Sequence, residues 1–139
     1  MAKLQLAIVT AEGESFSGEV DKVVAPGGLG EFTVLPSHAR MISTLSAGIL
    51  RFDQSGDSVS LAMSGGFLEV SDNRVTVLAD AAERDDAIDI ERAEAALARA
   101  QERVTGLSAD IDLERAMAAF RRARVRVNLG RRRGERGLN

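Results

Sequence analysis

The spacing of apolar residues changes once along this chain, and that change limits the folds that the chain can adopt. Up to about residue 82, apolar and polar side chains alternate in short segments, as at Leu4, Leu6 and Ile8, which is the period of a β-strand with one buried face. After residue 88, apolar residues recur at steps of three and four, which is the period of a helix. We therefore expect an α+β chain. Residues 1–85 should form an antiparallel β-sandwich, and residues 86–139 an α-helical hairpin with a basic tail.

The N-terminal region contains eight β-rich segments, of which the last six begin at intervals of roughly eight to ten residues. They are residues 3–10, 19–26, 30–36, 39–45, 47–53, 57–63, 65–70 and 73–80. Between them, Ser55-Gly56-Asp57 and Asp72-Asn73 are predicted hairpin loops, because these residue types tolerate positive φ. Such a series is typical of a sandwich or a flattened barrel.

Two glycine-rich segments of this region resemble functional loops but lack their context. Residues 27–30 are followed by no Lys-Ser/Thr and continue into a strand, so we expect a tight turn and no phosphate loop. Ser64-Gly65-Gly66 lacks the spacing of a nucleophile elbow, so we expect a bend between strands.

Two helical stripes occupy the C-terminal region. They consist of Ile90, Ala93, Leu97, Ala100 and Val104, then of Leu113, Ala116, Phe120, Ala123 and Val127. Asp89 is placed to cap the first helix, Gly106 to end it, and Ser108 or Asp110 to cap the second. Alanine dominates both stripes and buries little area, so we expect the hairpin to be held weakly and to be able to open.

The composition excludes most catalytic chemistry. The chain has no Cys, one His and five Phe as its only aromatic residues. Thiolate nucleophiles and Cys-based zinc sites are therefore absent, and His38 has no evident partner as a general base. Asp85, Asp86 and Asp89 lack the ordered spacing of a metal site, so we interpret them as favourable charge near a helix N-terminus. We expect neither catalytic nor metal-binding residues.

Charge is distributed unevenly. Residues 1–85 carry 12 acidic and 6 basic side chains, whereas residues 86–139 carry 9 acidic and 12 basic ones. Nine Arg and one Glu lie from Arg115 to the end. Three readings stay open: a site for a phosphate-bearing anion, a solvated face partly paired with Glu94 and Glu102, or a nucleic-acid-binding adaptor.

Several motifs resemble the epsilon subunit of bacterial rotary F-type ATP synthases. They are Gly30-Glu31-Phe32, Leu35-Pro36, His38-Ala39, Leu45 with Gly48, residues 64–70, residues 73–80 with Glu83, and Ile88-Asp89-Ile90-Glu91-Arg92-Ala93. The resemblance covers nearly the whole chain in order. It departs from the family's pattern at Ser37, where Gly is common, and at Arg40, where Pro is common.

The resemblance implies a non-catalytic subunit of the central stalk, which turns with the rotor and couples proton flow to ATP synthesis. It implies a sandwich of ten strands that contacts the gamma subunit and the ring of c subunits, with Glu31, Pro36 and His38 at the c ring. The expected location is the cytoplasmic face of the bacterial inner membrane, as a peripheral protein held through the complex. No nucleic acid is expected as a partner.

The resemblance also implies regulation by the hairpin. When extended toward the alpha/beta hexamer, it would hinder ATP hydrolysis. A basic surface would then face that hexamer: Arg115, Arg121, Arg122, Arg124 and Arg126. No cofactor is required, but some members bind ATP as a regulatory ligand, through positions that correspond here to Glu83, Asp89, Arg92, Arg99, Arg122 and Arg126.

Overall fold

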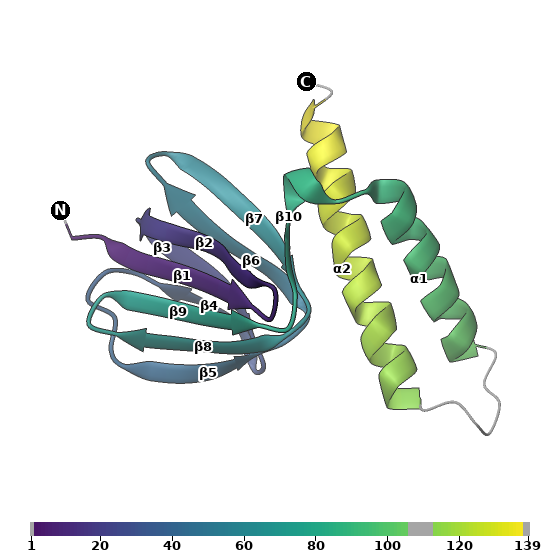
Figure 1. Ribbon diagram of the computed structural model, residues 1–139, viewed down its shortest axis with the longest axis horizontal. Coiled ribbons are helices and arrows are strands. Elements are labelled where there is room, and N and C mark those ends of the chain that lie inside the picture. Colours follow the sequence, from purple (N-terminus) through teal and green to yellow (C-terminus); the bar gives the residue numbers. More distant parts are fainter. Residues whose placement is uncertain (1, 106–112, 138–139) are drawn as a thin grey trace.

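The computed structural model describes residues 2–105 and 113–137 of the chain. Ten strands form a sandwich at the N-terminal end, and two helices lie beside one of its ends (Figure 1). The strands are β1 (Leu4–Thr10), β2 (Gly13–Val20), β3 (Lys22–Gly27), β4 (Gly30–Val34), β5 (Met41–Leu45), β6 (Gly48–Gln54), β7 (Asp57–Met63), β8 (Gly66–Ser71), β9 (Arg74–Ala79) and β10 (Ala82–Arg84). A short 3₁₀ turn, η1 (Asp85–Ala87), leads to α1 (Ile90–Thr105) and then α2 (Leu113–Gly137). The expected α+β fold is confirmed.

The strands form two layers that join at one pair of residues. One layer has the order β10-β7-β6-β3, with β4 paired to β3, and the other has the order β5-β8-β9-β1-β2. The layers meet where Gly27 of β3 pairs with Leu45 of β5. All neighbouring strands are antiparallel except β1 and β9, which are parallel, a detail that the sequence pattern did not show.

The core lies between the two layers and is built from the alternating apolar positions. Leu4, Leu6 and Ile8 of β1 are fully buried, as their spacing predicts. Across the core, Phe52 of β6 packs its ring on Phe16 of β2, with centroids 4.4 Å apart. Burial of large aliphatic and aromatic side chains is the main source of stability in such a layer.

The strand predicted at residues 19–26 is wrong in its bounds. The chain breaks at Asp21, so that β2 pairs with β1 while β3 pairs with β6 and crosses to the other layer. The Asp21 carboxylate marks this corner, since it accepts hydrogen bonds from Lys3 and from the backbone N–H of Ser55. The sequence pattern also missed β10, whose three residues pair with β7 and are too few to show a period.

The predicted turns are confirmed. Ser55, Asp72 and Asn73 have φ of 51°, 49° and 60°, which is the left-handed region that hairpin turns require. Gly30 follows the β3–β4 turn at φ 132°, so the glycine-rich segment is a tight turn as expected. Gly65 and Gly66 make the bend between β7 and β8.

The two helices pack on the predicted stripes. Ala93 and Ala100 of α1 are buried, as are Ala116, Ala123 and Val127 of α2. The helix α1 begins as predicted, because the Asp89 carboxylate accepts a hydrogen bond from the Arg92 backbone N–H at 3.1 Å, an N-cap contact. The expected helix end at Gly106 and the caps at Ser108 and Asp110 lie outside the described residues.

At its start, α1 lies very close to α2. A Cβ atom at Gly130 of α2 would lie 3.0 Å from Ile90 Cγ1 and 3.1 Å from Ile88 Cγ2. Within the hairpin it is α2 that contacts β7, β6 and η1, so α2 attaches the hairpin to the sandwich. Among the described residues, no helix has the length and apolar character that crossing a membrane would require.

Candidate functional site

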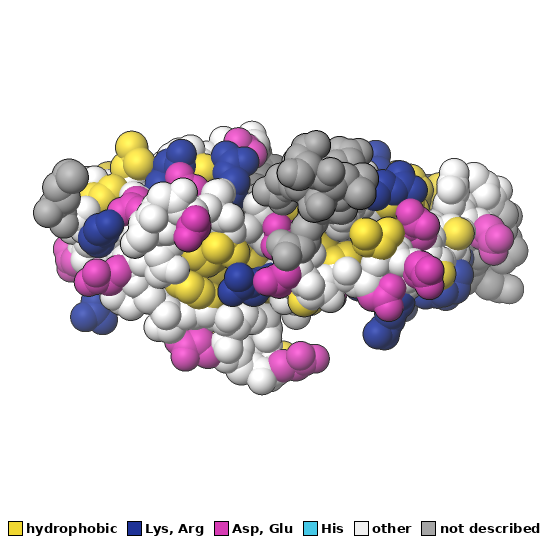
Figure 2. Space-filling model, turned by 90° about the horizontal axis from the view of Figure 1, so that it is seen from above, with side chains coloured by type: hydrophobic (Ala, Val, Ile, Leu, Met, Phe, Trp, Pro, Cys, Tyr) yellow, Lys and Arg dark blue, Asp and Glu magenta, His cyan; other side chains and the backbone are white. Residues whose placement is uncertain are grey.

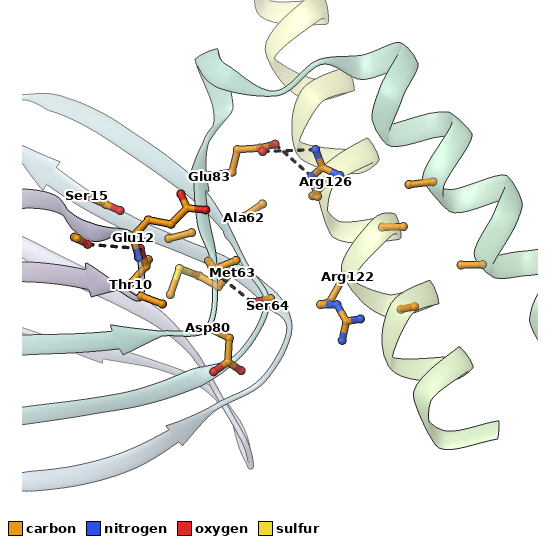
Figure 3. A pocket seen from close by; sticks show the side chains of 18 of the residues that line it. Thr10, Glu12, Ser15, Ala62, Met63, Ser64, Asp80, Glu83, Arg122 and Arg126 are labelled. Carbon is orange, nitrogen blue, oxygen red and sulfur yellow. Dashed lines mark hydrogen bonds and ion pairs between the residues drawn. The ribbon is translucent and has the colours of Figure 1, made fainter. Parts of the chain in front are cut away.

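A cavity of about 750 Å³ lies between the hairpin and the end of the sandwich, beside the contacts of α2 with β7. Its sandwich wall comes from the β1–β2 turn, the end of β7 and residues 80–83, and its other wall from the facing sides of α1 and α2 (Figure 3). The helix wall carries Arg99, Arg103, Arg122 and Arg126. Ala100 and Ala123, which belong to the two helical stripes, are buried and also line this wall.

One arginine of the cavity is already paired with the sandwich. Arg126 of α2 donates to both carboxylate oxygens of Glu83 in β10, with Nε–Oε1 at 3.1 Å and Nη2–Oε2 at 3.4 Å. The two side chains are 28% and 34% exposed, so solvent screens the pair only in part. The pair is visible as dashed lines in Figure 3 and is a direct link between the hairpin and the sandwich.

The structure brings together four of the six residues that the resemblance implied for ATP. Glu83, Arg99, Arg122 and Arg126 line the cavity. Asp89 and Arg92 do not line it. Here Asp89 caps α1, and Ala93, at the end of the same motif, is fully buried. The Asp-x-x-Arg-Ala spacing thus has a structural role in this conformation, because it starts the helix and seats it on α2.

The five arginines expected to face the alpha/beta hexamer lie on two sides of α2. Arg122 and Arg126 turn toward the cavity. Arg121 and Arg124 are exposed and do not line it, and Arg124 lies over the Phe120 ring at 5.8 Å from its centroid. Arg115 is exposed near the start of α2. In the folded hairpin, then, four of these five arginines are exposed, and Arg126 is half-buried against the sandwich.

The three residues expected at the c ring are exposed or half-buried but do not form one cluster. Pro36 and His38 lie in the loop after β4, where the His38 N–H donates to the Leu35 carbonyl. Glu31 lies near the start of β4, whereas this loop follows the end of the strand. Because each residue of an extended strand adds about 3.4 Å, Glu31 is separated from the loop by most of the strand's length. Ser37 has φ 68° and its N–H donates to Asn73 Oδ1. That bond ties the loop to the β8–β9 turn, at the end of the sandwich opposite the hairpin.

The sequence pattern missed an apolar patch on the outer face of the β5-β8-β9 layer. Ile42, Phe67 and Leu78 are 75%, 55% and 54% exposed. Phe67 pairs directly with Leu78 across the strands, and Ile42 lies diagonally to Phe67. The signal was present, because Phe67-Leu68 and Val77-Leu78 break the alternation and place apolar side chains on both faces. Contiguous exposed apolar surface marks an interaction site, and we name these three residues the outer patch.

Charge elsewhere serves the structure. Within the described ranges, no group of His, Cys, Asp or Glu is arranged to hold a metal ion. Asp86 pairs with Arg84 and Glu94 with Arg131. The hydrogen bond from Lys3, then that from the Ser55 N–H, lowers the pKa of Asp21 below its ordinary value. On the face in Figure 2, side chains of both signs are mixed over sandwich and helices, so this face is not a single-sign surface.

Two family models match the chain in succession. The beta-sandwich domain of the ATP synthase delta/epsilon chain matches residues 3–85, and the long alpha-helix domain of the same chain matches residues 86–129. The chain is 51% identical to the ATP synthase epsilon chain of Desulforamulus reducens over 112 residues, which are 80% of this chain and 85% of that protein. It is 52% identical to the epsilon chain of Pelotomaculum thermopropionicum over 100 residues, 72% and 75% of the two chains.

Solved structures share the fold. A chain of the Euglena gracilis mitochondrial ATP synthase superposes with a TM-score of 0.77 at 22% identity, over 87% of this chain and 77% of that one. A chain of the central stalk and c-ring of the Tetrahymena thermophila mitochondrial ATP synthase superposes with a TM-score of 0.59 at 16% identity. The superposition covers 94% of this chain and 96% of that one. The sandwich, the hairpin and the matches along both regions agree, and the chain belongs to the ATP synthase delta/epsilon chain family, among bacterial epsilon chains.

Proposed function

We propose that this chain is a non-catalytic subunit of the central stalk of a bacterial ATP synthase, at the cytoplasmic face of the membrane, and that its hairpin regulates ATP hydrolysis. The sandwich is the part that binds the rotor, and the helices are the part that moves. The observation that carries the regulatory half of this proposal is the arginine-lined cavity between the two parts.

The surfaces of the sandwich support contacts with two rotor partners. The outer patch of Ile42, Phe67 and Leu78 is an apolar face, which suits a stable protein neighbour such as the gamma subunit. The loop with Pro36 and His38 lies at the end of the sandwich opposite the hairpin and suits a second partner, the c ring. Contacts on different faces would let the sandwich bind both partners while the hairpin remains free to change position.

The hairpin is suited to switching because its contacts are weak and polar. Its buried seam consists mainly of alanine, and alanine side chains supply little apolar area. The Arg126–Glu83 pair is a direct polar link to the sandwich, and partly exposed ion pairs contribute about 0.2–1 kcal/mol. A ligand with a modest preference for the folded form would therefore change the populations strongly.

ATP is the ligand that we propose for the cavity. The volume lies within the range of about 300–1,000 Å³ that small-molecule sites have. Three guanidinium groups besides Arg126 can donate paired hydrogen bonds to phosphate oxygens. Since α1 and α2 both contribute, bound ATP would hold the two helices in the folded arrangement. Glu83 is better suited to orienting Arg126 than to facing a phosphate.

Binding and hydrolysis measurements test the two halves separately. Calorimetry on the isolated chain should show ATP binding that raises the melting temperature of the helices. Hydrolysis by the assembled complex should rise when the hairpin is removed. Absence of binding at millimolar ATP would refute the ligand, and unchanged hydrolysis in the complex without the hairpin would refute the regulatory role.

A further inference from the structure

The two walls of the hairpin cavity carry opposite charge. Glu12, Glu14 and Asp80 line the sandwich side in addition to Glu83, opposite the arginines of α1 and α2. We name Glu12, Glu14 and Asp80 the acidic wall. In Figure 3, Glu12 and Asp80 are on the strand side of the cavity and Arg122 is on the α2 side.

The acidic wall is formed by two turns that are far apart in the sequence. Glu12 and Glu14 lie at the β1–β2 turn, and Asp80 lies between β9 and β10. The parallel pairing of β1 with β9 places the ends of these strands side by side, which brings both turns to the edge that faces the hairpin. The acidic wall therefore continues the contact that the Glu83–Arg126 pair begins.

We propose that the acidic wall is a docking surface for this chain's own hairpin and holds it folded when no anion occupies the cavity. This proposal rests on the mobile hairpin of the proposed function. It adds the carboxylates that offset the positive charge of the cavity arginines. Without opposite charge nearby, Arg99, Arg103 and Arg122 would repel one another and favour opening. Carboxylates across the cavity attract all three and oppose that repulsion.

The acidic wall and an anionic ligand would compete for the same guanidinium groups. In the absence of ligand, the attraction acts through solvent and is sensitive to salt, since the Debye length falls from about 10 Å at about 0.1 M salt to about 3 Å at about 1 M. When an anion binds, its oxygens satisfy the arginines directly. The folded state would then be kept by the acidic wall at low salt and by the ligand at high salt.

The test uses the full chain, which contains no Cys, so that two labels can be placed freely. Spin labels at Thr33→Cys and Ala98→Cys, both exposed in the folded form, would report the distance between β4 and α1. The variant Glu12→Gln/Glu14→Gln/Asp80→Asn, without ATP at low salt, should shift the ratio of folded to extended hairpin about tenfold toward extended. The shift should disappear in about 1 M salt.

A matched control removes the same charge elsewhere. Glu19, Asp57 and Glu69 are exposed on the sandwich and do not line the cavity, so their amide variants should leave the ratio unchanged. The variant Arg99→Gln/Arg103→Gln/Arg122→Gln should lower the folded fraction. Adding it to the acidic-wall variant should have less effect than it has alone, because the interaction is already lost.

The acidic-wall variant, the arginine variant and their combination form a double-mutant cycle. When the cycle is measured by urea unfolding of the helices, it reports the interaction between the two sets of residues even if the hairpin never extends. We expect the two sets of substitutions to be non-additive at low salt and additive in about 1 M salt. Additive effects at low salt, or equal shifts in the control and acidic-wall variants, would overturn the acidic wall as a docking surface. If the distance between the two spin labels is the same in every condition but the cycle is non-additive, the movement of the hairpin is refuted and the acidic wall as a docking surface is supported.

Discussion

The sandwich and the hairpin are stabilised by different kinds of contact. The largest fully buried side chains of the sandwich include Phe52, Leu50 and Leu61, packed between two layers. The hairpin buries four alanines together with Val127 and Leu129 of α2, and it meets the sandwich through α2 and the Glu83–Arg126 pair. From this difference we expect the sandwich to fold by itself, and we expect the position of the hairpin to respond to charge, salt and ligands.

Removal of the hairpin is the strongest test of this difference. A chain that ends after Arg84 keeps all ten strands, so we expect it to fold and to bind the rotor. In the assembled complex, proton-driven ATP synthesis should continue and hydrolysis should rise. Circular dichroism of the fragment and both activities of the complex would check this. A fragment that does not fold, or a complex that loses coupling, would show that the sandwich depends on the hairpin.

A large-to-small substitution in each region compares the two directly. Phe52→Ala in the sandwich should cost about 3–5 kcal/mol of unfolding free energy, because it leaves a cavity in the core. Ala123→Gly in α2 should cost about 1 kcal/mol, chiefly through helix propensity. Urea unfolding followed by fluorescence of labels in each region would measure both. Similar costs at the two positions would contradict the contrast between a packed core and a thin seam.

The Glu83–Arg126 pair connects the regions, so its loss should remove regulation by ligand. We expect Arg126→Ala to abolish the rise in melting temperature that ATP produces in the helices while the sandwich remains folded. Arg124→Ala is the matched control, since Arg124 lies on the same helix outside the cavity. Scanning calorimetry with and without ATP would measure this shift in melting temperature for each variant. Loss of the ATP effect in both variants would point to net charge in place of the cavity.

The exposed side of α2 should act on the hexamer and not on the ligand. Arg121→Ala/Arg124→Ala should relieve inhibition of hydrolysis at low ionic strength by a few-fold, with a smaller effect at higher salt. ATP binding to the isolated chain should be unchanged. The control is Arg51→Ala/Arg74→Ala, which removes the same charge from the sandwich. Equal relief by both double variants would show that the position of the arginines is unimportant.

The smallest expected effect concerns the corner of the sandwich at Asp21. Hydrogen bonds from Lys3 and Ser55 lower the pKa of Asp21 in the folded state. The contribution of Asp21 is therefore present above its unfolded pKa and is lost as pH falls through the folded pKa. We expect Asp21→Asn to reduce the acid sensitivity of sandwich stability between about pH 6 and about pH 2. Identical pH profiles for the two proteins would show that this corner contributes nothing measurable.

Local features of the sequence predicted most elements of the fold. Ser55, Asp72 and Asn73 marked turns because few residue types accept positive φ, and Asp89 marked a helix start because it can cap free N–H groups. The split at Asp21 and the strand β10 were not predicted. Both depend on pairing with distant strands, β6 and β7, and a short segment has no period of its own.

The candidate site was predictable only in part. The arginine spacing indicated a basic face on each helix, and four of the six positions carried over by the resemblance share the cavity. Glu12, Glu14 and Asp80 were not predicted, because nothing in their neighbourhood distinguishes them from other exposed acids. The outer patch could have been found from the two adjacent apolar residues at Phe67-Leu68, which break strict alternation.

By itself, the sequence determined most of the inward-facing positions, the turns at Ser55 and at Asp72-Asn73, and the start of α1 after Asp89. These depend on side-chain period and backbone preference, which act over a few residues. Only the tertiary structure decided that Arg126 meets Glu83 and that the acidic wall faces the helices. The reason is that an ion pair or a cavity depends on how separate elements pack, and neither period nor propensity contains that information.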